Sequence, residues 1–236
     1  MAEAPGRRAS AESPIASVIQ RMTALERRLP ETDGVRRFND LYLAVTRGVA
    51  ADFEDGHFED PDFLAALDVS FAARYFDAVD AVDRGGKPSA AWEPLFADRS
   101  KPRIAPIQFA LAGMNAHINF DLCQALVATC EQRGVDLARD SAQHRDYLRV
   151  NAILARVEQQ VKTRFRGELI DVADEALGRL DDVLAMWSVE RARDAAWTHA
   201  EVLWKIREDS LLEEAYLDTL AHIVGLAGRG LLVPIL

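Results

Sequence analysis

The sequence predicts an all-α, single-domain bundle of about seven to nine helices around a buried central helix at about residues 106–133. Apolar residues recur at helical spacing along nearly the whole chain, and no stretch shows the two-residue alternation of a strand. Residues 104–130, which include most of this segment, contain a single charged side chain, Asp121, and a helix without a charged face is typically buried on all sides. A chain of 236 residues with 49% hydrophobic residues is long enough to bury such a core without disulfides.

The N-terminal segment differs in composition from the rest of the chain. Residues 1–12 are small, polar and charged, which predicts a flexible tail, and residues 13–236 form the predicted all-α domain. The tail contains two arginines but no apolar run behind them of the kind that a secretory signal requires. We therefore expect a cytoplasmic protein.

Proline and glycine mark the expected helices before the central one. The first helix begins at Pro14 and ends before Pro30, because proline fits the first turn of a helix and cannot continue one. A second helix is expected over 35–55 and a third over 61–85. The segment 85–103 is rich in proline and basic residues around a few aromatic ones, and we interpret it as a short helix in a loop. This loop is either a lid or a static connector.

Proline and glycine also mark the ends of the central helix, which begins at Pro106 and ends at Gly134. Apolar faces at helical spacing predict the helices that follow it, over 141–165, 169–187, 192–206 and 211–226. The apolar tail 231–236 is expected to pack back on the bundle or on a second subunit, which makes a homodimer a possible assembly.

The charge and the motifs that are absent exclude several classes of function. Lys and Arg number 28 against 38 Asp and Glu, so the formal charge is −10, and no local basic patch offers a site for nucleic acid or an anionic membrane surface. The most apolar stretch, 104–130, contains Asn, Gln, His and Asp, which are costly in lipid, so no membrane span is predicted. Cys123 and Cys130 would lie about 10 Å apart along one helix, too far for a disulfide, and are expected to be reduced and buried.

No glycine-rich phosphate loop, nucleophile elbow, cysteine-rich zinc pattern or His-Glu-x-x-His motif is present in the sequence. The commonest hydrolase and nucleotide-dependent classes therefore have no support.

The polar residues of the central helix are the candidates for function, because polar groups in a buried helix need partners. At about 100° per residue they fall into two stripes on opposite faces. His117, Asp121 and Gln124 form one stripe, and Gln108, Asn115 and Asn119 form the other.

We interpret His117 as a general base and Asp121 as the residue that orients it, because a neighbouring carboxylate raises the basicity of an imidazole and sets its tautomer. The alternative for this pair is a hydrogen-bonded core contact without a catalytic role. The polar residues that would bind a substrate are Asn115, Asn119, Gln124, His144 and Asn151. The leading hypothesis is thus a small-molecule enzyme of the cyclase, lyase or hydrolase type that needs no cofactor.

Two other functions remain open. A metal-dependent hydrolase or oxidase would use His117 and Asp121 as ligands, and since helical metal sites draw ligands from several helices, His144, His199 or His222 would complete the site. A non-catalytic binding or scaffold protein would instead dock a partner on its tail and exposed tryptophans. A cavity of a few hundred Å³ beside the histidine would favour a ligand site.

Two sequence runs resemble a known family. The runs Leu-Ala-Gly-Met-Asn-Ala-His-Ile-Asn-Phe-Asp-Leu at 111–122 and His-Arg-Asp-Tyr-Leu-Arg-Val-Asn at 144–151 are similar to the actinobacterial domain of unknown function 5995 family. The similarity extends over about residues 15–226. It implies no reaction, but it implies that His117, Asn119, Asp121, His144 and Asn151 belong to the family pattern. It also implies relatives in organisms rich in specialised metabolism, so we expect a biosynthetic role.

Overall fold

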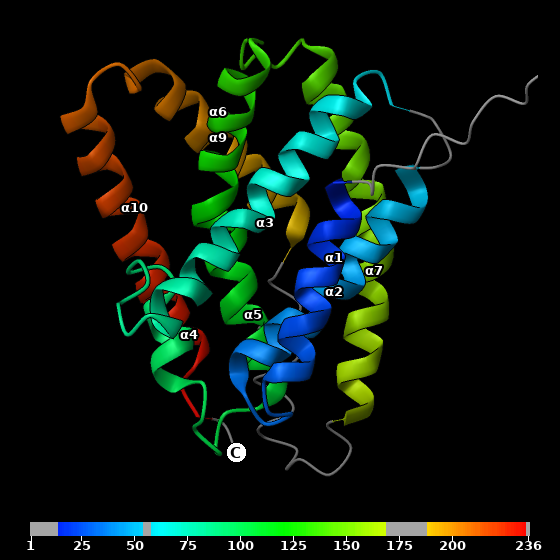
Figure 1. Ribbon diagram of the computed structural model, residues 1–236, viewed down its shortest axis with the longest axis vertical. Helices are drawn as coiled ribbons and strands as arrows, with labels where there is room; N and C mark the ends of the chain where they lie inside the picture. The colour runs from blue at the N-terminus through cyan, green and yellow to red at the C-terminus, as the bar shows by residue number, and fades with distance from the viewer. Residues whose placement is uncertain (1–13, 54–57, 169–187, 235–236) are drawn as a thin grey trace, which may run out of the picture.

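The computed structural model describes residues 14–53, 58–168 and 188–234 of the chain (Figure 1). It is an all-α, single-domain bundle, and no strand occurs in these ranges. This confirms the fold class that the sequence predicts. The predicted N-terminal tail over 1–12 and the predicted helix over 169–187 lie outside the described residues.

The first three helices form one side of the bundle. They are α1 (Pro14–Arg28), α2 (Gly34–Phe53) and α3 (Pro61–Asp83). The start of α3 is capped by Asp60, whose side chain accepts a hydrogen bond from the Phe63 backbone N–H at 3.0 Å. Each of the three helices contributes buried residues to one continuous core.

The connection after α3 contains the short helix α4 (Glu93–Asp98). Trp92, Leu95 and Phe96 of this connection are buried in the core. Three buried apolar side chains anchor the segment against the bundle, which is the behaviour expected of a static connector.

The central helix is divided into three parts. The first is α5 (Pro106–Ala116), the second is the five-residue π-helical segment η1 (His117–Asp121), and the third is α6 (Leu122–Arg133). Gly134 ends α6 with φ of 64°, a left-handed conformation that glycine adopts without steric cost. The sequence predicts a single α-helix over this range and does not anticipate the π-helical segment.

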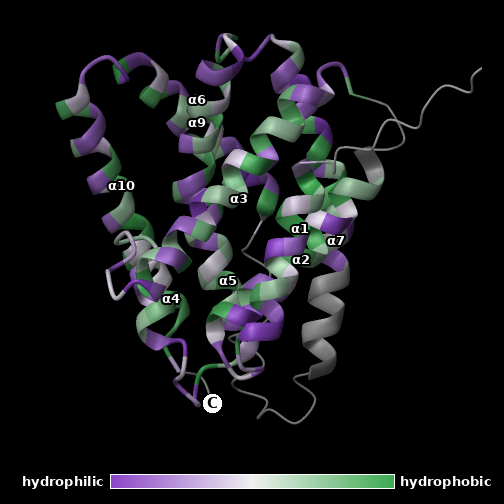
Figure 2. Ribbon diagram, viewed as in Figure 1, coloured by the Kyte–Doolittle hydropathy of each residue, from purple (hydrophilic) through white to green (hydrophobic). Residues whose placement is uncertain are grey.

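The central helix contacts helices on several sides. In Figure 1 it runs through the bundle from α5 to α6, with α5 against α2 and α10, and α6 against α3 and α9. This explains why the sequence here is mostly apolar, with few charged residues, since neighbours cover the helix on more than one side. Figure 2 shows hydrophobic and hydrophilic residues mixed along most of the other helices, as expected where only one face is buried.

Three longer helices complete the described bundle, α7 (Ala142–Glu168), α9 (Val189–Ile206) and α10 (Ser210–Leu231). Side chains cap the starts of the last two: Ser188 accepts from the Arg191 backbone N–H, and Asp209 accepts from two backbone N–H groups of α10.

The end of the chain packs back on the bundle, one of the two arrangements that the sequence predicts. Leu232 is buried, and the Gln108 side-chain amide donates to the backbone carbonyls of Leu231 and Val233, both at 2.7 Å. Cys123 and Cys130 are free and buried, as predicted. Among the described helices, none is both long and apolar enough to span a bilayer.

Candidate functional site

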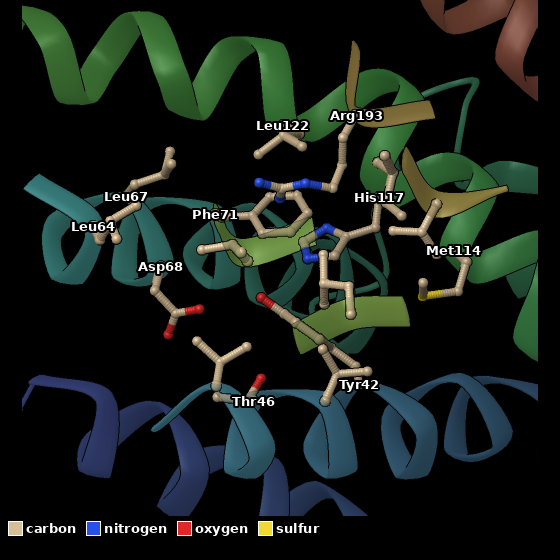
Figure 3. Close-up of a pocket in the computed structure, with 16 residues that line it drawn as sticks. Tyr42, Thr46, Leu64, Leu67, Asp68, Phe71, Met114, His117, Leu122 and Arg193 are labelled. Atoms are coloured by element: carbon tan, nitrogen blue, oxygen red, sulfur yellow. The ribbon is translucent and has the colours of Figure 1, made fainter. Parts of the chain in front are cut away.

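A partly enclosed cavity of about 80 Å³ lies beside the π-helical segment, between α2, α3, α7 and α9 (Figure 3). Its walls are mainly aliphatic and aromatic side chains. The polar side chains that line it are Tyr42, Thr46, Asp68, His117 and Arg193. A mainly apolar cavity with a few convergent polar groups has the composition of a small-molecule site, but its volume is below the few hundred Å³ expected of one, so it suits only a small ligand.

His117 and Asp121 form a hydrogen-bonded pair at this cavity. The Nδ1 atom of His117 lies 2.9 Å from Oδ2 of Asp121, and both side chains are almost completely buried. The two residues are the first and last of the π-helical segment. Isolated π-helical turns are rare, and those that occur are frequently found at functional sites. The position of the pair at the two ends of this segment therefore favours a functional role.

The neighbours of Asp121 determine the tautomer of His117. The indole Nε1–H of Trp92 donates to the same Oδ2 atom at 3.0 Å, and an indole N–H cannot accept a hydrogen bond. Oδ2 therefore acts as an acceptor, and the simplest arrangement has an ionised carboxylate receiving both this bond and the Nδ1–H bond of a neutral His117. The Nε2 atom of His117 then carries a lone pair.

The Nε2 atom of His117 is buried and has no hydrogen-bond partner in the described part of the chain. The ring stacks on Phe71, with centroids 3.6 Å apart and planes 5° apart, and Tyr42 contacts it edge-on with centroids 4.6 Å apart. Figure 3 shows the ring projecting between these two side chains toward the cavity. Burial lowers the pKa of His117, although the hydrogen bond and charge of Asp121 oppose the change, so the ring is neutral near pH 7.

Asp68 provides an acidic group on another wall of the cavity. Burial raises its pKa to about 7, so protonated and ionised forms coexist at neutral pH. Its Oδ2 atom has no hydrogen-bond partner within residues 14–53, 58–168 and 188–234. A carboxyl group with this pKa is able to donate or accept a proton near pH 7.

Two hydroxyl groups on α2 also lack partners. The Tyr42 hydroxyl and Oγ1 of Thr46 are buried, and neither has a hydrogen-bond partner among the described residues. Burial, and secondarily the charge of Asp68, raises the pKa of Tyr42 well above its usual value. Tyr42 therefore keeps its proton and offers an O–H donor to a bound molecule.

Arg193 of α9 brings a buried guanidinium to the cavity wall. Its Nε atom donates to Oδ1 of Asn151 at 2.6 Å, and its Nη2 atom donates to the backbone carbonyl of Tyr147 at 2.7 Å. The cavity thus combines a neutral histidine, a titratable carboxyl group, two hydroxyls and a cation.

The family of unknown function DUF5995 matches the chain over residues 15–234. The chain belongs to this family. No curated protein and no solved structure matches it. As the DUF5995 description assigns no reaction, the geometry of the cavity carries the functional argument.

Three predicted site residues of this DUF5995 chain lie away from the cavity walls. Asn115 donates to the Val224 carbonyl at 2.9 Å, and Asn119 donates to Oδ1 of Asn115 at 3.1 Å. Gln124 accepts from Arg74 of α3 at 2.9 Å. The π-helical segment explains the position of Gln124, because one extra residue in a turn shifts the following side chains by about 100° around the axis.

The predicted residues of α7 occupy different environments. His144 bonds through Nδ1 to the Arg139 carbonyl at 2.7 Å and lies against Trp197. Asn151 is not among the residues that line the cavity, but it accepts a hydrogen bond from Arg193, which is. Asn151 therefore positions a cavity residue, whereas His144 serves the packing of α7 on α9.

The histidines considered as further metal ligands are separated in the structure. His199 bonds to the Tyr216 hydroxyl at 2.7 Å, and His222 is exposed on α10, where it bonds to the Asp218 carbonyl. Neither these two nor His144 lines the cavity that contains His117. No group of three or more His, Cys, Asp or Glu side chains suited to a metal ion occurs in the described ranges.

Two charged residues of the cavity, Asp68 and Arg193, are not predicted from the sequence. Asp68 lies between Leu64, Leu67 and Phe71, and all four side chains line the cavity. Arg193 lies on the buried face of α9 with other buried residues of that helix. The sequence signal that could have identified them is a charged residue at an apolar position of an amphipathic helix, since charged residues are rarely buried unless they are paired.

Proposed function

We propose that this chain is a small-molecule enzyme in which His117 acts as the general base and Asp121 as the residue that positions it. The observation that supports this most is the buried Nε2 atom of His117, which lacks a partner within the described residues while Nδ1 is held by Asp121. Leaving a buried polar group unpaired costs about 1–3 kcal/mol, and such groups are rare in folded proteins. A substrate proton at this position would give Nε2 its partner.

The proposed proton transfers use two of the groups that line the cavity, His117 and Asp68. Nε2 of His117 removes a proton from the bound molecule, and Asp121 stabilises the imidazolium that forms because its carboxylate accepts the Nδ1–H bond. Protonated Asp68 then supplies a proton to the oxygen atom or leaving group on which negative charge develops. The Tyr42 hydroxyl donates a hydrogen bond to the same developing charge.

The walls favour a reaction within the substrate over hydrolysis. Most side chains around the cavity are aliphatic or aromatic and fit the carbon skeleton of a substrate, and the few polar groups are left to act as base, acid and hydrogen-bond donor. An elimination or a cyclisation requires only a base and an acid at suitable positions. Among the three reaction types considered for this chain, we therefore favour the lyase and cyclase types.

Exchange of substrate hydrogen for deuterium tests the base with simple model compounds. The protein is incubated in D2O near pH 6.5 with 2-hexanone and 2-oxopentanoate, whose hydrogens next to the carbonyl are weakly acidic, and proton NMR follows their loss. We expect the protein to accelerate exchange in at least one compound. His117→Gln should slow it by about 10²–10⁴-fold, the usual contribution of a general base.

His222→Gln provides the control, because His222 is exposed and does not line the cavity. It should exchange at the wild-type rate. Absence of accelerated exchange, or equal rates for His117→Gln and the wild type, would show that His117 is not a general base.

Three further expectations stay predictions and are part of this proposal. They are a biosynthetic role in an actinobacterium, a cytoplasmic location and a homodimer. The exposed apolar residues on the outer side of α10 offer a surface for a second copy; they include Leu212, Ile223 and Leu226.

A further inference from the structure

We propose that the molecule bound in this cavity is a short apolar compound with one carboxylate, and that Arg193 binds the carboxylate. The inference names the ligand class of the site described under the proposed function. It depends on that proposal for the reaction, whereas the charge preference depends on Arg193 alone.

The guanidinium of Arg193 is buried and held in a fixed orientation. The residue is 7% exposed, and its guanidinium carbon lies 3.8 Å from the centroid of the Tyr147 ring. Asn151 and the Tyr147 carbonyl accept hydrogen bonds from Nε and Nη2. A guanidinium has five N–H donors, so these two bonds leave three for a ligand.

The described surroundings of Arg193 contain no group that compensates its charge. Its partners are an amide oxygen, a backbone carbonyl and an aromatic face, all of which are formally neutral. In the part of the chain that the structure describes, no carboxylate forms an ion pair with it. A buried charge is costly unless an opposite charge accompanies it, and the planar guanidinium matches a carboxylate with two parallel hydrogen bonds. An anionic ligand group would supply the missing charge.

The other end of the cavity disfavours a second negative group. Asp68 is already partly ionised near pH 7, and no ion pair links it to Arg193 within the described ranges. Figure 3 shows Arg193 and Asp68 on different sides of the Phe71 and His117 side chains. A ligand with its carboxylate at Arg193 therefore extends its neutral part past His117 toward Asp68. This direction places a central atom of the ligand beside the unpaired Nε2.

The size and the walls of the cavity define the rest of the ligand. The cavity is about 80 Å³, and since one water-sized occupant needs roughly 10–15 Å³, it holds about five to eight non-hydrogen atoms. Hexanoate, with eight non-hydrogen atoms, is at the upper end of this range. The aliphatic side chains that line the cavity include Leu64, Leu67, Met114 and Leu122, and they fit a hydrocarbon chain.

Binding of matched ligands tests the inference. Calorimetry at pH 7 measures hexanoate, 1-hexanol and hexylamine, which share the hydrocarbon chain and differ in the charge of the head group. We expect wild-type protein to bind hexanoate at least about tenfold more tightly than hexanol, and hexylamine most weakly. Equal affinity for hexanoate and hexanol would overturn the proposal.

Three variants assign the preference to Arg193. Arg193→Gln should bind hexanoate and hexanol equally, whereas Arg191→Gln, an exposed position on the same helix, should keep the wild-type preference. Arg193→Lys retains a charge without the planar geometry and should keep a reduced preference, which provides a second test if the glutamine variant does not fold. A full preference for hexanoate in a folded Arg193→Gln protein would also overturn the proposal.

The His117→Gln variant separates this inference from the proposed function. It should lose deuterium exchange and still prefer hexanoate, since Arg193 is intact. Normal exchange in this variant together with a hexanoate preference would contradict only the role of His117. Loss of exchange with no hexanoate preference in the wild type would contradict only the role of Arg193.

Discussion

The two polar faces of the central helix use their buried polar groups differently. On one face, Gln108 and Asn115 donate to backbone carbonyls of α10 and of the segment that follows it. On the other face, His117 holds Asp121 with one ring nitrogen and leaves the second without a partner among the described residues. The first face joins elements of the fold, whereas the second keeps hydrogen-bonding capacity for a ligand. A buried polar residue therefore indicates a ligand site only where one of its hydrogen-bonding atoms has no partner in the protein.

Among the substitutions that distinguish the two faces, Asp121→Asn is expected to have the largest effect on deuterium exchange. An amide oxygen at the position of Oδ2 still accepts from His117 and Trp92, so the hydrogen bonds and the tautomer are retained. The negative charge that stabilises the imidazolium is lost, and we expect deuterium exchange to slow by about 10²-fold, or about 2.7 kcal/mol in the barrier. Proton NMR of the exchange reaction measures this rate.

Asp77→Asn is the matched control for Asp121→Asn, because Asp77 is an exposed carboxylate on α3 that does not line the cavity. Its exchange rate should equal that of the wild type. An unchanged rate in Asp121→Asn would mean that the pair has only a structural role.

Asn115→Ala tests the opposite face. The substitution removes the donor to the buried Val224 carbonyl, so we expect the free energy of unfolding to fall by about 1–3 kcal/mol. Urea denaturation measures this change. Deuterium exchange per folded molecule should remain at the wild-type rate, because the side chain does not line the cavity. A slower exchange with unchanged stability would instead make Asn115 a substrate-binding residue.

The sequence predicted the fold and the central pair because both depend on local patterns. Pro106 and Gly134 mark the ends of the central helix, and the i,i+4 spacing places His117 next to Asp121. The same i,i+3 and i,i+4 geometry placed Gln124 on the face of His117 and Asp121, but Gln124 does not line the cavity. The π-helical segment rotates the residues that follow Asp121 around the helix axis. Apolar periodicity and helix-end signals do not anticipate such a segment.

Other parts of the site depend on contacts between distant segments. Trp92 reaches Asp121 from the connection before α4, and the cavity brings Asp68 of α3 together with Arg193 of α9. The sequence marks Asp68 and Arg193 only as charged residues on apolar helical faces. Their convergence on one cavity requires the tertiary structure.

Asp68→Asn should change the pH dependence of exchange. In the wild type, Asp68 donates only while protonated, so the rate should fall as the pH rises through about 7, the pKa to which burial raises this carboxyl group. Burial lowers the pKa of His117, and deprotonation of a general base raises the rate with pH, so His117 does not cause this decrease. The asparagine variant should lack the decrease near pH 7. Exchange rates of both proteins are measured between pH 5.5 and 8.5. A decrease that persists in Asp68→Asn would mean that Asp68 is not the acid.

Asp68→Asn should remove the proposed catalytic acid but increase the stability of the protein. Because the pKa of Asp68 is raised in the folded state from 3.8 to about 7, its ionisation destabilises the protein progressively as the pH rises from about 4 to about 7. Asp68→Asn removes this cost, and we expect it to be more stable than the wild type at pH 8 by up to about 4 kcal/mol, with the difference disappearing toward pH 4. Urea denaturation at both pH values measures it, and a variant that is less stable at pH 8 would contradict the expectation.

Asn119→Ala should have the smallest effect. Asn119 is half-buried at the edge of the structural face and donates to Oδ1 of Asn115 at 3.1 Å. Water is able to replace this bond, so we expect a loss of about 0.5–1 kcal/mol in unfolding free energy and no change in deuterium exchange. The double variant Asn115→Ala/Asn119→Ala should lose less unfolding free energy than the two single variants together, because each single variant already removes the bond between the two residues. Strict additivity would mean that Asn119 acts independently of Asn115, and a slower exchange would extend the functional face around the helix.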